Sequence, residues 1–397
     1  MSNRDASIQS RAGWLLVAAL MVAAGDVVAA REDVLLNASA GAFYDSNRTL
    51  VEGDGNEVNG THQRARVRYQ VATESSRIEG ALNVLEQQLP GYEYLENDRL
   101  GISFLGNSEL ERANLNSSVS VQRDTTLSTE VQAAGVINEN KDRLLSTLAG
   151  GYGYLLTERD QLNVGVTAEK VDYDDIRSAE LAEYLFYGVD TGYTRSFSDT
   201  TRLQLSLYES VLDNDESGLT GDTVGFIVNL EQQLTPVWRW KAGLGRRESR
   251  YEWERVAGLA DGFTDTSRSR VSDFELAYDG ETARMKLFGA YDLVPSSGGS
   301  LVARRSAGTT ILQSWSAVQN TLLNMRYWEQ RSDLEVKSGE DLDSLQFTLE
   351  HNWRLMRKMN LVFRYSRFER LLLATDARAE SDFVEFEIAW IEDPLSM

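Results

Sequence analysis

Arginine and lysine recur at every second position along several segments of the chain. In the clearest run, Arg64, Arg66 and Arg68 alternate with the apolar residues Ala65 and Val67. A guanidinium binds carboxylate and phosphate groups through a planar fork and keeps its charge at any relevant pH. Rings of such residues in a pore select for anions. The predicted anion or polymer contacts are Arg64, Arg66, Arg68, Arg202, Arg239, Lys241, Arg284, Lys286, Arg326, Arg354 and Arg364.

Acidic residues share the polar side of these segments, and they give the pattern a second interpretation. Barrel interiors commonly pair arginine with aspartate or glutamate, which satisfies charges that are partly removed from water. The sequence alone leaves open whether the basic residues form a net cationic surface or a set of internal ion pairs. The candidate partners are Glu79, Glu169, Asp190, Glu231, Asp273, Glu275, Glu350, Glu385 and Glu387.

Further acids concentrate in the long polar connections between the alternating segments. Such a rim can hold divalent cations shared with lipopolysaccharide, or it can keep the connections solvated and apart. The chain has a formal net charge of −21. The acids in question are Glu52, Asp54, Glu57, Asp172, Asp174, Asp175, Glu180, Asp213, Asp215, Glu216, Asp333, Glu335, Glu340 and Asp341.

The residues do not predict an enzyme, a metal site or a bound cofactor. The chain has no cysteine and two histidines, His62 and His351. His62 is expected in a loop and His351 on the apolar side of a strand, so neither is placed to activate a nucleophile or bind zinc. Phosphate loops, dinucleotide fingerprints and nucleic-acid modules are not present in the sequence.

The elements that carry these residues are predicted to be β-strands. Between Thr223 and Leu234, Val224, Phe226 and Val228 fall on one face, and the polar residues fall on the other. A period of two indicates a strand with one apolar and one polar face. About eighteen such strands follow one another, within a range of 16 to 18. They are expected to begin near Val34, Gln63, Arg77, Arg99, Leu115, Arg143, Asp160, Ala182, Thr201, Gly221, Trp238, Arg268, Thr282, Arg305, Gln319, Asp341, Met359 and Ser381.

Short and long connections alternate along the chain, which is typical of a bacterial outer-membrane barrel with periplasmic turns and outer loops. We therefore predict an all-β fold, a transmembrane antiparallel up-and-down β-barrel with both termini in the periplasm. Residues 293–304 are expected to form one of the long outer loops, and residues 124–142 another with some strand character. A β-sandwich would need two domains and a linker, and a solenoid would need a fixed short repeat, so both are less favoured.

The first thirty residues have the order of a secretory signal peptide. Arg4 and Arg11 precede an apolar run that starts at Trp14, and small residues follow before Ala30. The run is too short to span a bilayer as a helix. We expect cleavage near Ala30, which leaves residues 31–397 as one barrel domain in the outer membrane of a Gram-negative bacterium. The expected partners are outer-membrane lipid and lipopolysaccharide, with no nucleic acid.

The last strand ends close to Trp390, and many outer-membrane barrels end on an aromatic residue that the barrel-assembly machinery recognises. Further residues follow Trp390, so the assembly signal differs from the usual form. We expect the assembly machinery to be a partner of the chain.

Three segments resemble a group of outer-membrane barrels linked to exopolysaccharide export and the PEP-CTERM sorting system. They are residues 42–48 (AFYDSNR), residues 293–302 (LVPSSGGSLV) and the strand-turn-strand form of residues 151–162. The group carries no catalytic residues to transfer. The resemblance implies an outer-membrane location, a part in the secretion of a surface polysaccharide, and export components in the periplasm as partners.

From the basic polar face and this resemblance, we expect a passive channel for an exported anionic exopolysaccharide. One alternative is a general diffusion porin for small solutes, and another is a plugged barrel that acts as a surface scaffold or adhesin. The polymer, the oligomeric state and any inward-folded loop are not determined by the residues.

Overall fold

The computed structural model of the chain describes residues 31–50, 57–126, 140–174, 181–214, 218–253, 264–296, 299–332, 341–373, 375–392 and 395–396. The expected signal peptide, residues 1–30, lies outside the described residues, as do several of the acids of the expected rim. Those acids are Glu52, Asp54, Asp175, Glu180, Asp215, Glu216, Asp333, Glu335 and Glu340.

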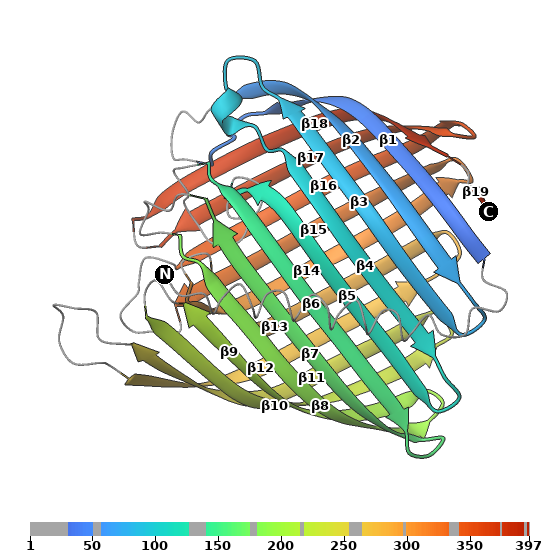
Figure 1. The fold of residues 1–397 in the computed structure, drawn as a ribbon, viewed down its shortest axis with the longest axis vertical. Helices are drawn as coiled ribbons and strands as arrows, with labels where there is room; N and C mark the ends of the chain where they lie inside the picture. Colours follow the sequence, from blue (N-terminus) through green and yellow to red (C-terminus); the bar gives the residue numbers. More distant parts are fainter. Residues whose placement is uncertain are drawn as a thin grey trace, which may run out of the picture.

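The described residues form one antiparallel β-barrel (Figure 1). Each strand pairs with the next, and β1 closes the ring by pairing with β18. A two-residue strand, β19(Leu395–Ser396), also pairs with β1. The eighteen strands of the wall are β1(Arg31–Asp45), β2(Val58–Ala72), β3(Ser76–Gln88), β4(Arg99–Glu109), β5(Ala113–Thr125), β6(Asp142–Leu155), β7(Asp160–Tyr173), β8(Tyr184–Ser198), β9(Thr201–Asn214), β10(Leu219–Thr235), β11(Trp238–Trp253), β12(Thr264–Asp279), β13(Ala283–Pro295), β14(Leu301–Ser316), β15(Gln319–Ser332), β16(Leu342–Met356), β17(Met359–Leu372) and β18(Ala377–Ile391).

The predicted fold class is confirmed, and each expected strand corresponds to one strand of the wall. The expected starting residue matches the observed one at β4, β7, β9, β11, β15 and β17. The largest offset is at β2, which begins at Val58 instead of Gln63. Residues 58–62 of β2 extend beyond the run of alternating apolar residues, so the sequence pattern does not reveal this end of the strand.

The two faces of the wall follow the predicted alternation. Large apolar side chains are exposed on the outside, as at Leu207, Val224 and Leu244, which are 58%, 57% and 72% exposed. Their polar neighbours in sequence point into the lumen. An apolar outer face is what a barrel needs where lipid replaces water.

The connections differ at the two ends of the barrel. At one end, here called the turn end, the strands join through short turns such as Thr235–Trp238, where the Thr235 hydroxyl accepts a bond from the Trp238 amide. The other end, the loop end, carries the longer connections, including the one with the 3-10 helix η1(Glu93–Leu95). β1 begins and β18 ends at the turn end. Among the described residues, no helix is long and apolar enough to cross a membrane.

Candidate functional site in the lumen

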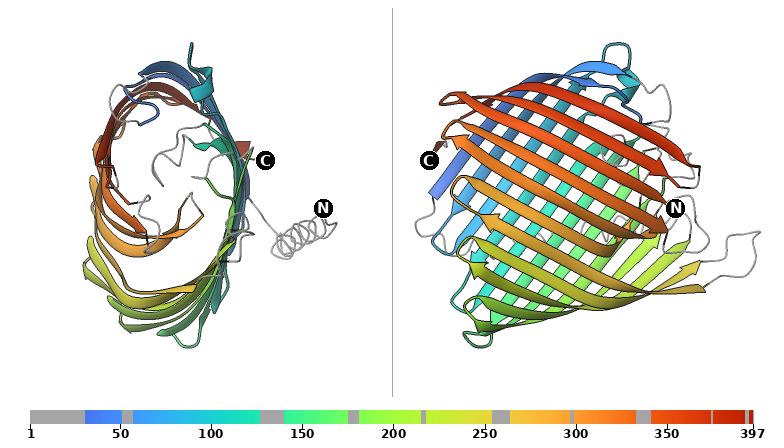
Figure 2. Two further views of the ribbon diagram at one scale, coloured as in Figure 1. Left: turned by 90° about the vertical axis from the view of Figure 1, so that its left-hand side faces the viewer. Right: turned by 180° about the vertical axis from the view of Figure 1, so that it is seen from behind.

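The barrel wall changes course between β12 and β13. Pairing between these two strands runs from Asp279↔Arg284 only as far as Ser272↔Tyr291. On either side it continues farther toward the loop end: β11 and β12 pair up to Glu252↔Thr264, and β13 and β14 up to Pro295↔Leu301. The ends of β13 and β14 therefore separate from β12, while β14 stays paired with β15 up to Val302↔Ser332. Figure 2 (left) shows these orange segments inside the ring of strands. We call residues 292–296 and 299–304 the inward hairpin.

The inward hairpin packs against the inner face of β7 to β11, the strands that precede β12 in the wall. Leu301 belongs to one buried apolar cluster with residues of these strands, and Leu293 packs against the cluster. Leu301 is 1% exposed, and Tyr251, its partner on β11, is 0% exposed. Burial of this kind contributes about 1.5–3 kcal/mol per large apolar side chain, so the contact can hold the hairpin away from β12. The other buried members are Val171, Tyr173, Leu181, Tyr184, Leu212 and Leu219.

Polar contacts fix the tip of the hairpin. The Ser296 amide donates to the Ser300 carbonyl at 2.8 Å, and the two hydroxyls lie 3.0 Å apart. Gly299 has a φ of +65°, a conformation that a side chain disfavours. Its carbonyl accepts a bond from Asn214 Nδ2 at 3.2 Å. Asn214 ends β9, so the tip is tied to the loop end of that strand.

The prediction of a long outer loop at residues 293–304 is therefore wrong. The segment is the end of a paired hairpin, and it points into the barrel. Leu293 and Leu301 lie on the same side of β13 and β14 as the residues that face lipid nearer the turn end. Their positions in the sequence therefore predict that they face outward. In the folded chain that side meets the inner face of β7 to β11. The physical reason is that an apolar face is satisfied equally well by lipid or by apolar side chains.

A second apolar cluster lines the lumen at the loop end beside β1 and β2. Phe43, Val58, Leu89 and Leu95 are its buried members. Beside it, Arg48 lies on the ring of Phe43 and donates to Gln87 Oε1 at 2.6 Å. Burial lowers the pKa of the Arg48 guanidinium below its usual value, and the nearby Asp45 offsets only part of this shift. The loop end is thus narrowed by side chains from two sides.

The eleven basic residues predicted to contact an anion or a polymer, here called the ladder, lie on the lumen face. Most of them form ion pairs with acidic residues. Arg68 and Arg66 each lie 3.7 Å from Glu79, and Lys286 lies 2.6 Å from Glu275. These pairs support the interpretation of the ladder as internal ion pairs. The other paired members are Arg64 with Glu385 and Glu387, Arg239 with Glu275, Lys241 with Asp273, Arg284 with Asp279, and Arg364 with Glu350 and Glu385.

Three predicted members differ from the rest. Arg202, Arg326 and Arg354 have no carboxylate within 4.0 Å among the described residues. Arg326 lies over the ring of Trp328 at 5.5 Å. Arg202 lines a lumen recess of about 270 Å³. The other lining residues are Gln161, Asn163, Thr194, Gln204, Asn229, Glu231 and Lys241. The recess offers amide, hydroxyl and cationic groups, and the carboxylate of Glu231, to a small polar molecule.

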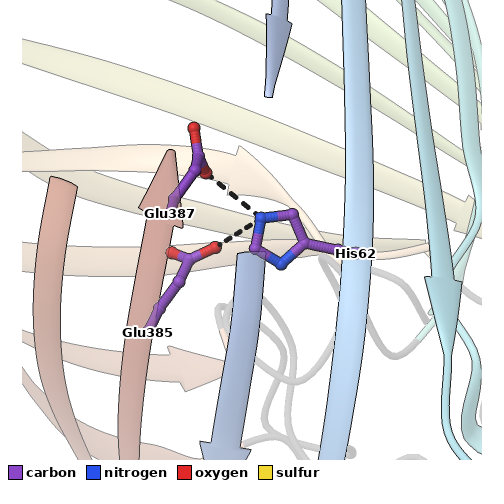
Figure 3. A group of neighbouring side chains, drawn as sticks. All are labelled: His62, Glu385 and Glu387. Atoms are coloured by element: carbon purple, nitrogen blue, oxygen red, sulfur yellow. Dashed lines mark hydrogen bonds and ion pairs between the residues drawn. The ribbon is translucent and has the colours of Figure 1, made fainter. Parts of the chain in front are cut away.

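His62 is the second departure from the expected arrangement. It was expected in a loop, but it lies within β2, is 2% exposed and faces the lumen side. Figure 3 shows its Nε2 between two carboxylates of β18, 3.1 Å from Glu385 and 3.2 Å from Glu387. The intervening strand β1 has Gly41 at this point, paired in register with both His62 and Glu387. The missing side chain lets β2 reach β18 across β1.

Three ligand atoms of His62, Glu385 and Glu387 lie within 4.8 Å of one another, which is close enough to hold a metal ion. The same carboxylates are already bound by arginines. Arg64 contacts both of them, and Arg364 joins Glu385 to Glu350. Three acids thus face two guanidinium groups and one imidazole. We interpret these six residues, the seam network, as an ion-pair network that joins β2 to β16, β17 and β18 across β1.

His351 lies on the outer face of β16, as expected, and its Nδ1 is 2.9 Å from the Thr321 hydroxyl. The features that sequence reasoning missed are the direction of the inward hairpin and the burial of His62. A signal for the second was present, because His62 continues the parity of Arg64, Arg66 and Arg68 by one further step.

No family model matches the sequence, and no curated protein matches it either. Among solved structures, the chain is similar to OccK2 (OpdF) of Pseudomonas aeruginosa in complex with glucuronate, at 11% identity over 92% of this chain and 98% of that one, with a TM-score of 0.47. It is similar to OpdL of the same organism at 10% identity (92% and 99% covered, TM-score 0.45). It is also similar to a BenF-like porin from Pseudomonas fluorescens Pf-5 at 11% identity (93% and 99% covered, TM-score 0.46). Our fold assignment rests on the strand pairing itself.

Proposed function

We propose that the chain is an outer-membrane channel through which small polar solutes diffuse. The turn end would face the periplasm and the loop end the outside. The apolar outer face supports the membrane location, because this belt is where lipid contacts a barrel. The observation that carries the proposal is the inward hairpin, which lies inside the barrel above a polar, charge-paired interior. A narrowed lumen of this kind suits small molecules better than a polymer.

The paired ladder supports the same choice. A conduit for an anionic polysaccharide is expected to present many uncompensated cations along its length. Here eight of the eleven predicted contacts have an acidic partner, and Arg202, Arg326 and Arg354 are the other three. Ion pairs give the lumen alternating charge, which orients dipolar solutes without a strong net attraction for a polyanion.

The recess at Arg202 supports a preference for small solutes that carry a carboxylate. Its volume of about 270 Å³ is close to the lower limit of small-molecule sites. The planar fork of an arginine without an internal acid is available to a solute carboxylate. The neighbouring Gln161, Asn163 and Gln204 can bond to hydroxyl groups of the same molecule.

Liposome swelling and bilayer recordings test the proposal. We expect proteoliposomes to admit sugars and small sugar acids, with the acids entering faster than neutral sugars of the same size. An acidic polysaccharide should neither pass nor block the current. Passage or block by the polysaccharide would instead support the export conduit with its periplasmic partners. The absence of any conductance in the presence of folded barrel would support the plugged scaffold.

A further inference from the structure

Arginines interrupt the apolar outer face of β11 and β12 at one level of the barrel. Starting at the turn end of β11, the outward side chains are apolar through Leu244, and Arg246 and Glu248 follow. On β12 the outward side chains are apolar from Tyr278 to Phe274, and Ser272, Arg270 and Arg268 follow toward the loop end. We call Arg246, Glu248, Arg268 and Arg270 the outer arginine patch.

The level of the patch matches the far edge of a bilayer. Trp238 and Tyr278 pair their rings at 4.9 Å on the outer wall near the turn end, as an interfacial girdle does. A tilted strand needs about 9–11 residues to cross the hydrocarbon core. Counted from Trp238, that length ends close to Arg246. A charge on the lipid face costs far less at this level than at the bilayer centre.

Two arginines of the patch face each other without an acidic partner. Arg246 and Arg270 are directly opposite in the register of β11 and β12. Neither has a carboxylate within 4.0 Å among the described residues, whereas the next pair, Arg268 and Glu248, is bonded at 2.8 Å. Like charges directly opposite on neighbouring strands repel each other. An anion between them would turn this repulsion into binding, because each guanidinium offers a fork of donors.

Apolar side chains stand next to the two arginines. In the same cross-strand row, Leu207 of β9 pairs with Phe226 of β10, which pairs with Arg246. With Val224 they line a recess of about 650 Å³ that also contains the whole outer arginine patch. Leu207 and Phe226 are 58% and 41% exposed. The recess thus offers a cationic side to a headgroup and an apolar side to an acyl chain.

We propose that the outer arginine patch binds a phosphate group of lipid A, the lipid of lipopolysaccharide in the outer leaflet. Arg246 and Arg270 hold the phosphate between them. Arg268 supplies a third cation, which Glu248 orients. The acyl chains of the same lipid lie over Leu207, Val224 and Phe226. This lipid site lies on the outside of the wall and is independent of transport through the lumen.

Native mass spectrometry of the detergent-solubilised protein, titrated with diphosphorylated lipid A, tests the site. The double variant Arg246→Gln/Arg270→Gln should lower the affinity roughly tenfold or more, since two charge-assisted contacts are lost. The matched control is Arg195→Gln, an outward arginine near the turn end that is paired with Asp160 at 3.3 Å. The control should bind lipid A as the unchanged protein does. Heat-modifiable migration on gels confirms that each variant is folded, and the single variant Arg270→Gln replaces the double one if that fails to fold.

Three further probes distinguish lipid A from other sources of phosphate. Dephosphorylated lipid A should bind as weakly to the unchanged protein as diphosphorylated lipid A binds to the double variant. Inorganic phosphate at millimolar concentration should not displace lipid A, and phosphatidylglycerol should bind more weakly. The proposal would be overturned if the double variant bound diphosphorylated lipid A as tightly as the unchanged protein does. It would also be overturned if dephosphorylated lipid A or phosphatidylglycerol bound the unchanged protein as tightly as diphosphorylated lipid A does, or if inorganic phosphate displaced lipid A. The conductance of the double variant should stay unchanged, so this test and the transport test fail separately.

Discussion

The barrel wall has two junctions that differ in how they are held. At the β1–β18 junction the strands pair in register from Asn37↔Ile391 to Asp45↔Phe383, and the seam network ties β2 to β18 across β1. At the β12–β13 junction, pairing ends at Ser272↔Tyr291, and the inward hairpin separates from β12 while it stays paired with β15. The first junction closes the barrel through backbone hydrogen bonds and buried charge. At the second, apolar burial on the inner face of β7 to β11 replaces the pairing between β12 and the end of β13.

This difference separates stability from function. Damage to the β1–β18 junction should unfold or fail to assemble the barrel, because no alternative partner exists for the edges of the two strands. Damage to the hairpin contact should leave the barrel closed and alter only what passes through it. The following predictions examine that separation, starting with the largest effect.

Glu385→Ala should produce the largest loss of stability. Glu385 is 1% exposed and accepts contacts from Arg64, Arg364 and His62. Removing one member of a buried ion-pair network leaves its partners unsatisfied and typically costs about 3–5 kcal/mol. The lower end is expected, because the two arginine side chains are 34% and 28% exposed. Urea unfolding in lipid vesicles measures the change.

Glu369→Ala is the matched control for that substitution. Glu369 lies on the outer face of β17 and pairs with Arg367 at 2.8 Å and Arg378 at 3.1 Å in a more exposed network. Exposed pairs contribute about 0–1 kcal/mol. An equal loss of stability in both variants would mean that the seam network has no special part in closure.

Leu301→Ala should weaken the docking of the inward hairpin while the barrel stays closed. Truncation of a buried leucine costs about 2–5 kcal/mol, and here that cost falls on the contact between the hairpin and β7 to β11. Hydrogen exchange at the end of β14 should rise, with little change at β1 and β18. Ile311→Ala, on the lipid face of the same strand, should leave the exchange of the hairpin unchanged. Increased exchange at β1 and β18 in Leu301→Ala would contradict the separation.

Gly41→Val should weaken the β1–β18 junction from its centre. A Cβ at Gly41 would lie 2.4 Å from the Phe386 carbonyl oxygen and 2.7 Å from the His62 ring, so the backbone and the histidine must both shift. Overpacking of this kind costs about 1–3 kcal/mol. The yield of heat-modifiable folded barrel should fall. Ala40→Val, one residue earlier on the lipid-facing side, should fold normally, and equal yields for both would refute the close approach.

Arg202→Gln should have the smallest effect, confined to ion selectivity. The reversal potential in a salt gradient should move toward cations by more than it does for Arg284→Gln, because Arg202 lines a lumen recess, whereas the Arg284 side chain is 69% exposed and its charge is screened by the salt. Neither substitution should change the unfolding free energy by more than about 0.5 kcal/mol. A larger shift in the paired variant would remove the special role of the Arg202 recess.

The strands and the direction of their faces could be predicted because both depend on local alternation. Val224, Phe226 and Val228 have the same period in the sequence and in the wall. The sequence predicts ion pairing of the ladder only as one of two alternatives, because it does not show which side chains meet across neighbouring strands. Arg68 meets its acid where β2 pairs with β3, and Lys286 meets its acid where β13 pairs with β12. Six of the nine candidate acids pair with ladder residues: Glu79, Asp273, Glu275, Glu350, Glu385 and Glu387.

The inward hairpin could not be predicted, because its course depends on contacts far apart in the chain. Leu293 and Leu301 have the parity of lipid-facing residues, and nothing in their neighbours reveals that Tyr251 and Leu212 cover them. The role of the ladder as a contact surface for an anion stays a prediction, and so does the part in polysaccharide secretion that the resemblance implies.

Single-channel conductance of the unchanged protein and of Leu293→Ala/Leu301→Ala, in the presence of polyethylene glycols of increasing size, tests the central claim most directly. If the inward hairpin narrows the lumen, the variant should conduct more current and admit larger polymers, while its folded yield stays the same. Identical conductance and an identical polymer cut-off in the two proteins would contradict the account.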